Sequence, residues 1–414
     1  MSSSTRPSPK PWDRRPGLVQ ALLERRSRAN EGFFAVEAER IARLCHQMAE
    51  RFASGGRLLA IGTDAQARSD ARHVAVEFVH PVIVGKRALP ALALSSDGVP
   101  LARQVELHAE VTDILIAFGG PLDGVGVAVR TARNRGCLTI AFHPRSEAEW
   151  EFQPPTTDPF VGQELVETLY HILWELVHVF FEHRGLLAGR SPGPSHDAGA
   201  ASFLYPFLAQ AEHDLKRVVA EVRCSVTSKA AEIGGLREQT LTENRHGLLQ
   251  AAEALRHAFD RGGKLLVMGN GGSATDAMDL AADLRSPPGD WPQRPCIDLT
   301  EDPAILTAIA NDIGPEAIFA RQIIAYLRPH DVVLALSTSG GSANVLEGLA
   351  EARRRGAGTI ALVGYDGGRI AGERLADLVL ITRSQHIPRI QEAQASACHV
   401  LRALIEEDAV EASP

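Results

Sequence analysis

The chain has 414 residues, a formal net charge of −8 and 45% apolar residues. These values are ordinary for a globular protein of two or three domains, and the acidic balance argues against a general nucleic-acid role. The five cysteines form no CxxC pair, which argues against a disulfide framework or a zinc–thiolate site and favours a reducing cytoplasm. The most apolar run, residues 165–181, contains two Glu and two His, so it predicts a packed helix rather than a membrane span.

The composition along the chain predicts a tail, two similar halves and a linker. Residues 1–17 are rich in Ser, Pro and Arg and predict a disordered tail, whereas the Gly-, Pro- and Ser-rich residues 185–204 predict a linker. The flanking segments, 18–184 and 205–412, share the order of their motifs. For example, ERFASGGRLLAIG in the first half matches HAFDRGGKLLVMG in the second. We interpret the chain as a tandem duplication.

Each half alternates short apolar runs with helical segments. The apolar runs are residues 57–61, 91–95, 114–118 and 138–142 in the first half, and 264–268, 296–299, 332–336 and 358–363 in the second. This alternation predicts an α/β fold in which each half is a doubly wound parallel sheet of five strands flanked by helices. Long amphipathic helices at about 207–233 and 241–261 precede the second sheet and would suit packing against a partner subunit.

Two apolar runs of the second half break into loops of small residues, GNGGS at 269–273 and STSGGS at 337–342. Each loop is followed by a helical pattern. Glycine lets the backbone approach an anion closely, helix N-termini offer N–H groups, and hydroxyls add donors. Because ligands of such sheets bind at the carboxyl ends of the strands, the pattern predicts a phosphorylated small molecule as ligand.

These segments resemble the sugar isomerase (SIS) fold and, within it, the phosphoheptose isomerases, which act on sedoheptulose 7-phosphate. The matching segments are GNGGSATDA (269–277), AIANDIG (308–314), STSGGSANV (337–345), GTIALVGYDGGRIA (358–371) and RIQE with a later His (389–399). The resemblance covers residues 205–412 and, more weakly, 18–184. It implies that the substrate and its phosphate are bound by Asn270, Gly271, Gly272, Ser273, Asp312, Ser337, Thr338, Ser339, Ser342 and Gln391.

The catalytic and metal-binding set of that family is a His and a Glu spaced HxxxE, with a Gln and a His eight residues apart. The second half keeps Gln391 and His399 but has Asp279 and Asp283 in place of the HxxxE pair. The first half carries the full set, His73, Glu77, Gln163 and His171. Its loops, TDAQARSDA and AFGGPLDG, have lost the phosphate pattern. Phosphate chemistry and the intact catalytic set therefore lie in different halves.

The resemblance implies an aldose–ketose isomerisation through an enediol, with Glu77 as base and His171 as acid, or Asp283 and His399 in the second half. The four residues of the first-half set would bind a divalent ion, and their donor types suit Zn²⁺. Eight residues of α-helix rise about 12 Å. Gln163 can therefore join His171 on one ion only from an irregular entry to its helix.

Several alternatives remain open. The first half is either a structural relic or a contributor to a composite site, in which one half binds phosphate and the other performs the chemistry. The protein is either an isomerase or a non-catalytic phosphosugar-binding SIS protein that acts as a sensor or assembly partner. Two further alternatives are a different phosphosugar as the substrate and a relationship to the isomerase half of glucosamine-6-phosphate synthase. We expect a homo-oligomer, a dimer of pseudo-dimers, without nucleic-acid or membrane partners.

Overall fold

The computed structural model describes residues 15–82, 86–95, 98–120, 124–143, 146–182, 187 and 214–406. They form two compact units. One comprises residues 15–28, 234–268 and 287–406, and the other comprises the described residues of 29–233 together with 269–286. The tail prediction lies outside the described residues except for 15–17, which belong to the first helix. Of the predicted linker, only Leu187 is described.

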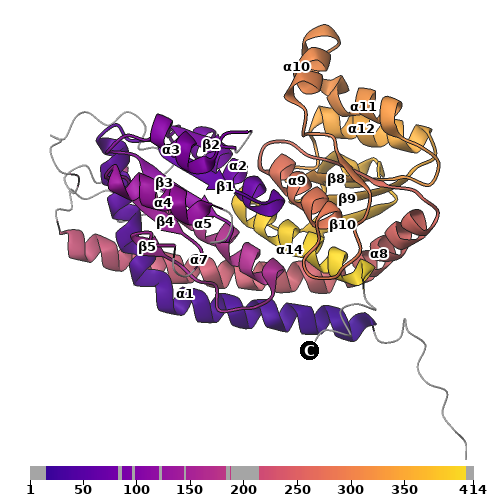
Figure 1. Cartoon of the computed structure of the whole chain (residues 1–414). Helices are drawn as coiled ribbons and strands as arrows, with labels where there is room; N and C mark the ends of the chain where they lie inside the picture. Colours follow the sequence, from indigo (N-terminus) through magenta and orange to yellow (C-terminus); the bar gives the residue numbers. More distant parts are fainter. Residues whose placement is uncertain are drawn as a thin grey trace, which may run out of the picture. The chain divides into compact units, whose positions relative to one another are not determined.

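The elements of the first half follow the predicted alternation (Figure 1). They are α1 (Arg15–Ala53), β1 (Leu58–Gly62), α2 (Ala65–Val79), β2 (Ala91–Leu94), α3 (Leu101–His108), β3 (Ile114–Phe118), α4 (Val125–Asn134), β4 (Leu138–Ala141), β5 (Trp150–Glu151) and α5 (Pro159–Glu182), and α7 (Leu215–Glu243) follows as the first helix of the second half. The strands form one parallel sheet in the order β2-β1-β3-β4-β5.

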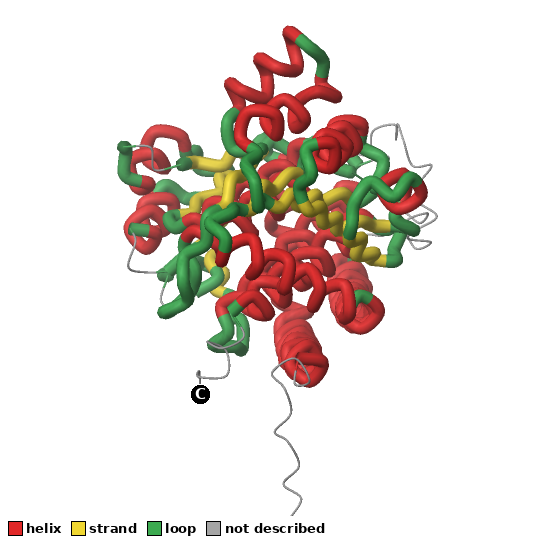
Figure 2. The backbone as a smooth tube through the Cα atoms, turned by 90° about the vertical axis from the view of Figure 1, so that its right-hand side faces the viewer, coloured by secondary structure: helices red, strands yellow, loops and turns green. Residues whose placement is uncertain are grey.

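Alternate residues of this sheet enter two separate apolar cores. Leu58 and Ile116 pack into the core shared with α1, α2, α5 and α7, whereas Leu59 and Leu115 pack into the core shared with α3 and α4. Burial on both faces explains why these strands read as continuous apolar runs rather than as alternating patterns. Helices on both sides of the strands are visible in Figure 2.

The second half repeats this order of elements. They are α8 (Arg245–Asp260), β6 (Leu265–Met268), α9 (Gly272–Arg285), β7 (Cys296–Asp298), α10 (Pro303–Asp312), η5 (Pro315–Ala317), α11 (Ile318–Tyr326), β8 (Val332–Ser337), α12 (Ala343–Arg354), β9 (Gly358–Gly364), α13 (Gly368–Gly372), β10 (Leu378–Thr382) and α14 (Ile387–Ile405). The parallel sheet has the order β10-β9-β8-β6-β7. Read from β7, each strand takes the place of its counterpart in the first sheet.

Two details differ from the sequence-based elements. The described part of the helix expected at about 207–233 belongs to α7, which begins at Leu215, continues to Glu243 and is followed at once by α8. The fifth strands, β5 and β10, were not located in the sequence. β5 has two residues, and β10 (LVLIT) is only partly buried, so neither stands out as a buried apolar run.

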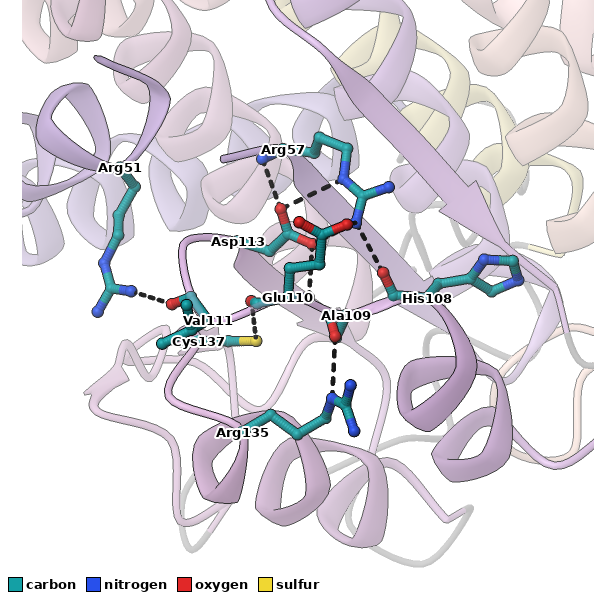
Figure 3. A network of polar contacts seen from close by, with 9 residues as sticks. All are labelled: Arg51, Arg57, His108, Ala109, Glu110, Val111, Asp113, Arg135 and Cys137. Atoms are coloured by element: carbon teal, nitrogen blue, oxygen red, sulfur yellow. Dashed lines mark hydrogen bonds and ion pairs between the residues drawn. The ribbon is translucent and has the colours of Figure 1, made fainter. Parts of the chain in front are cut away.

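A buried carboxylate joins the start of the first sheet to its neighbouring turn (Figure 3). Asp113 is 1% exposed and accepts hydrogen bonds from the backbone N–H groups of Arg57 at 2.7 Å and Glu110 at 2.9 Å. The Arg57 guanidinium also donates to it at 2.7 Å. Asp331 makes the same backbone contacts to Lys264 and Arg328 in the second sheet. The carboxylate thus fixes the entry of β1 and β3 in one half, and of β6 and β8 in the other.

We expect Asp113→Ala to lower the free energy of unfolding by about 3 kcal/mol, because two buried N–H groups and a guanidinium lose their acceptor. Glu110→Ala is the control, since the Glu110 side chain is exposed and its ion pair with Arg57 should contribute less than about 1 kcal/mol. Denaturant unfolding of both variants measures the difference. Equal losses would contradict this assignment.

Candidate active site

Helices α2 and α5 bring the first-half set together. Both helices have a carboxylate cap, because Asp64 accepts from the N–H of Ala67 at 2.7 Å and Asp158 accepts from the N–H of Phe160 at 3.1 Å. His73 and Glu77 are four residues apart on α2 and therefore share one face. That face packs against α5, which carries His171.

Three of the four predicted residues form one buried cluster. His73 Nε2 lies 3.3 Å from His171 Nε2 and 3.9 Å from Glu77 Oε1. Donor atoms of the three residues all lie within 4.8 Å of one another, and each residue is at most 3% exposed. We call His73, Glu77 and His171 the catalytic cluster.

Burial sets the charge state of the cluster's central imidazole. Desolvation, followed by the nearby His171, holds the pKa of His73 well below its usual value. His73 is therefore neutral at neutral pH, which is the form that ligates a metal ion or accepts a hydrogen bond. Tyr170 lies beside His73, and its pKa is raised well above the usual value, first by burial and then by nearby carboxylates. The carboxylates belong to Glu167, Asp70, Asp276 and Asp279.

Gln163, the fourth predicted residue, has a different partner. It lies on α5, five residues into the helix, and its side-chain amide donates to Asp279 Oδ1 at 2.7 Å. Asp279 belongs to α9, which packs beside α2 (Figure 1). The structure therefore gives Gln163 a contact with the aspartate that replaces the family's histidine.

The structure also places two residues at the cluster that the family pattern missed. The second ring nitrogen of His73, Nδ1, lies 3.7 Å from Asp276 Oδ1 on α9. Glu167, one turn before His171 on α5, completes a set in which donor atoms of His73, Glu167 and Asp276 lie within 4.8 Å of one another. The i, i+4 spacing of Glu167 and His171 was a usable signal for Glu167. No local sequence pattern predicts the contact between Asp276 and His73, because the two residues lie far apart in the chain.

A second histidine on α5 lies two turns beyond the cluster. His178 is 3% exposed, and its ring nitrogens lie 2.8 Å from the Trp174 carbonyl oxygen and 3.1 Å from that of Arg87. Burial, with a contribution from Lys86, lowers the pKa of His178 to about 4. Because the unfolded chain takes up this proton near pH 6.5, the neutral residue contributes full stability above that pH.

We therefore expect a loss of stability as the pH falls from about 6.5 towards 4, of about 3 kcal/mol for this group. His178→Asn should reduce the slope of unfolding free energy against pH by about one proton across this window. Urea unfolding at several pH values measures it, with His257→Asn, on α8, as the control. Parallel curves for the wild type and His178→Asn would contradict the assignment.

The predicted phosphate loops follow β6 and β8, which are parallel neighbours. Gly271 occupies the N-cap position of α9, with φ +57°, and has no side chain that could accept hydrogen bonds from the first-turn N–H groups. In the first half, Asp64 occupies the same position of α2, and its carboxylate does accept such a bond. In the β8 loop, Ser337 Oγ accepts from Gly340 N–H and Ser339 Oγ accepts from Gly341 N–H. The predicted phosphate-binding residues differ in exposure. The exposed ones are Asn270, Gly271 and Ser339, the half-buried ones are Gly272, Thr338 and Ser342, and the buried ones are Ser273 and Ser337.

The shape of the β8 loop depends on glycine. Gly340 has φ +61°, and a Cβ there would lie 2.3 Å from the Gly367 carbonyl oxygen. A side chain at this position would push the hydroxyl-bearing loop away from the α13 turn.

The remaining predicted residues lie on other elements. Asp312 is exposed at the end of α10 and accepts from the Asn311 amide at 2.7 Å. Gln391 and His399 are buried on α14. Asp283 is buried on α9, where the Gln66 amide donates to it at 3.2 Å.

Comparison with known proteins gives the class. The model of the SIS domain matches residues 230–364. Two solved structures match over nearly the whole chain and show the fold alone. The C-terminal domain of glucosamine-fructose-6-phosphate aminotransferase from Francisella tularensis has a TM-score of 0.56 at 11% identity, covering 94% of this chain and 95% of that one. Tagatose-6-phosphate ketose/aldose isomerase from Escherichia coli has a TM-score of 0.53 at 11% identity, covering 96% and 94%.

This chain is therefore an SIS-domain protein, and the predicted fold of two parallel five-stranded sheets flanked by helices is confirmed. A phosphoheptose isomerase from Trichlorobacter lovleyi is 45% identical over 159 residues, which are 38% of this chain and 80% of that protein. The chain belongs to the phosphoheptose isomerase family through its second half. A role as a phosphosugar isomerase or phosphosugar-binding protein follows. Among the described helices, none has the length and apolar character needed to cross a membrane.

Proposed function

We propose that the protein is an aldose–ketose isomerase of the sedoheptulose 7-phosphate isomerase type. The observation that carries the proposal is the catalytic cluster, in which His73, Glu77 and His171 are buried with donor atoms within 4.8 Å of one another. The names of the relatives, which are phosphoheptose isomerases, support the substrate class.

The cluster provides the groups that an enediol mechanism needs. Glu77 acts as the base and removes the proton from the carbon next to the carbonyl. His171 acts as the acid and delivers a proton to the carbonyl oxygen, and the two exchange roles as the enediol collapses to the isomeric sugar. Their burial excludes water, which strengthens the electrostatic interactions during proton transfer.

The donor set of the cluster fits a zinc ion. Two imidazole nitrogens and one carboxylate oxygen suit Zn²⁺, and ligand atoms on a tetrahedral Zn²⁺ lie about 3.4 Å apart. His73 Nε2 lies 3.3 Å from His171 Nε2 and 3.9 Å from Glu77 Oε1, which is close to that value. His73, His171 and one oxygen of Glu77 would hold the ion; when bound, it would polarise the substrate carbonyl in place of a proton from His171, and the second oxygen of Glu77 would remain the base.

The second half supplies the phosphate contacts. Ser337 and Ser339 accept backbone N–H groups through their oxygens, so their hydroxyl hydrogens can be donated to a phosphate. The uncapped start of α9 adds backbone donors. In the first half the Asp64 carboxylate already occupies the equivalent position, which disfavours a phosphate there.

A discontinuous assay with sedoheptulose 7-phosphate, with and without Zn²⁺, tests the proposal. We expect turnover to the aldose that a chelator reduces. Absence of turnover, with a melting-temperature shift on ligand addition that Ser339→Ala removes, would instead establish a non-catalytic phosphosugar-binding protein. The presence of Asp279 and Asp283 in the half that keeps the phosphate loops favours that second candidate.

A further inference from the structure

His73 has neighbours at both edges of its ring. Nε2 faces His171 and Glu77, as the catalytic cluster requires. Nδ1 faces Asp276 at 3.7 Å, about 0.5 Å beyond an ordinary hydrogen bond. Asp276 is 6% exposed, and it comes from α9, more than two hundred residues away in the chain.

A hydrogen bond aligns α9 with α2 at this point. Ser69 Oγ, one turn before His73, donates to the carbonyl oxygen of Thr275 at 2.8 Å. Thr275 is the residue before Asp276, so this bond sets the register in which Asp276 meets His73. Gln66, at the start of α2, donates to Asp283 and to the Ser286 carbonyl near the end of α9.

We infer that Asp276 is a positioning residue that orients the His73 ring through Nδ1, so that a helix of the second half completes the catalytic cluster of the first. The inference rests on the proposed metal-dependent function. A carboxylate at Nδ1 accepts the ring N–H and selects the tautomer whose Nε2 lone pair points at the ion. A donor atom of Glu167 lies within 4.8 Å of donor atoms of both residues, so a second carboxyl group is close to this pair.

The inference explains why α9 keeps an aspartate at this position. Asp276 in TDA corresponds to Asp70 in SDA of the first half, but the residue three positions later is Asp279 in α9 and His73 in α2. His73 faces the α9 aspartate, Asp276, whereas the position of α9 that corresponds to His73 is itself an aspartate, Asp279. The equivalent aspartate, Asp70, provides a matched control that removes one charge from the same buried region.

Zinc affinity of the full-length protein, measured by competition with a chromophoric chelator, tests the inference. We expect Asp276→Asn to weaken Zn²⁺ binding about 10- to 100-fold, and Asp276→Glu, which can still reach Nδ1, to recover part of the loss. Asp70→Asn should change the affinity much less. The melting temperature of the metal-free Asp276→Asn variant should stay at or above that of the wild type, since a neutral amide replaces a buried carboxylate.

The outcomes separate the two proposals. If the wild type binds no Zn²⁺, the metal-dependent mechanism fails and the positioning role fails with it. If the wild type binds Zn²⁺ and Glu77→Gln abolishes binding, while Asp276→Asn binds as tightly as Asp70→Asn, only the positioning role is overturned. A metal-free Asp276→Asn variant that melts well below the wild type, with no recovery of affinity in Asp276→Glu, would also overturn it by showing a structural role.

Discussion

Glu77→Gln is expected to reduce the kcat of isomerisation by about 10³-fold, within the range of about 10²- to 10⁴-fold for general acid–base catalysis. The amide keeps the size of the side chain but cannot accept the substrate proton. Because Glu77 is 1% exposed, water has little access to replace it. Steady-state kinetics with sedoheptulose 7-phosphate measure the loss.

Glu106→Gln is the matched control, since the Glu106 side chain is 51% exposed and forms a surface ion pair with Arg103. We expect its kinetics to equal those of the wild type. Glu77→Asp should retain part of the activity, because a carboxylate one methylene shorter still accepts a proton, although from a greater distance. A Glu77→Gln enzyme with near wild-type kcat would contradict the assignment of the base.

Ser339→Ala should lower kcat/KM by about 10- to 100-fold, mainly through a higher KM, because one hydrogen bond to a charged phosphate contributes about 1.5–3 kcal/mol. The substitution deletes a hydroxyl whose oxygen already accepts from Gly341 N–H, so the lost group is the donor to the ligand. Ser339 is exposed in the β8 loop, and its loss leaves no cavity in the core.

The same assay checks this prediction, with Ser228→Ala, an exposed position of α7, as the control. A substrate analogue without the phosphate should be equally poor for the wild type and for Ser339→Ala. If Ser339→Ala instead discriminates against the phosphate-free analogue as strongly as the wild type does, the loop does not bind the phosphate.

The sequence predicted the sheets well because their strands are buried on both faces. Leu58–Gly62 and Val332–Ser337 are buried throughout, consist of apolar residues up to their last position and lead into small-residue loops, which is a local signal. β5 and β10 lack that signal, since β5 has two residues and β10 is partly buried. The boundary between α7 and α8 was also missed, since α7 continues through Gly234 and Gly235 to Glu243.

The candidate site was predictable where its residues share one helix. His73 with Glu77 follows from i, i+4 spacing, and His171 follows from the family pattern. Asp276 was not predictable from local sequence, because its contact with His73 depends on how α9 packs against α2. The partner of Gln163 was missed for the same reason, since Asp279 also lies on α9.

The most direct measurement of the central claim is proton exchange at the sugar in D₂O, followed by NMR of sedoheptulose 7-phosphate. An enediol mechanism predicts that the wild type replaces a hydrogen on the carbon next to the carbonyl with deuterium, and that Glu77→Gln does not. Exchange that is undiminished in Glu77→Gln would contradict a base at Glu77 in an enediol isomerase.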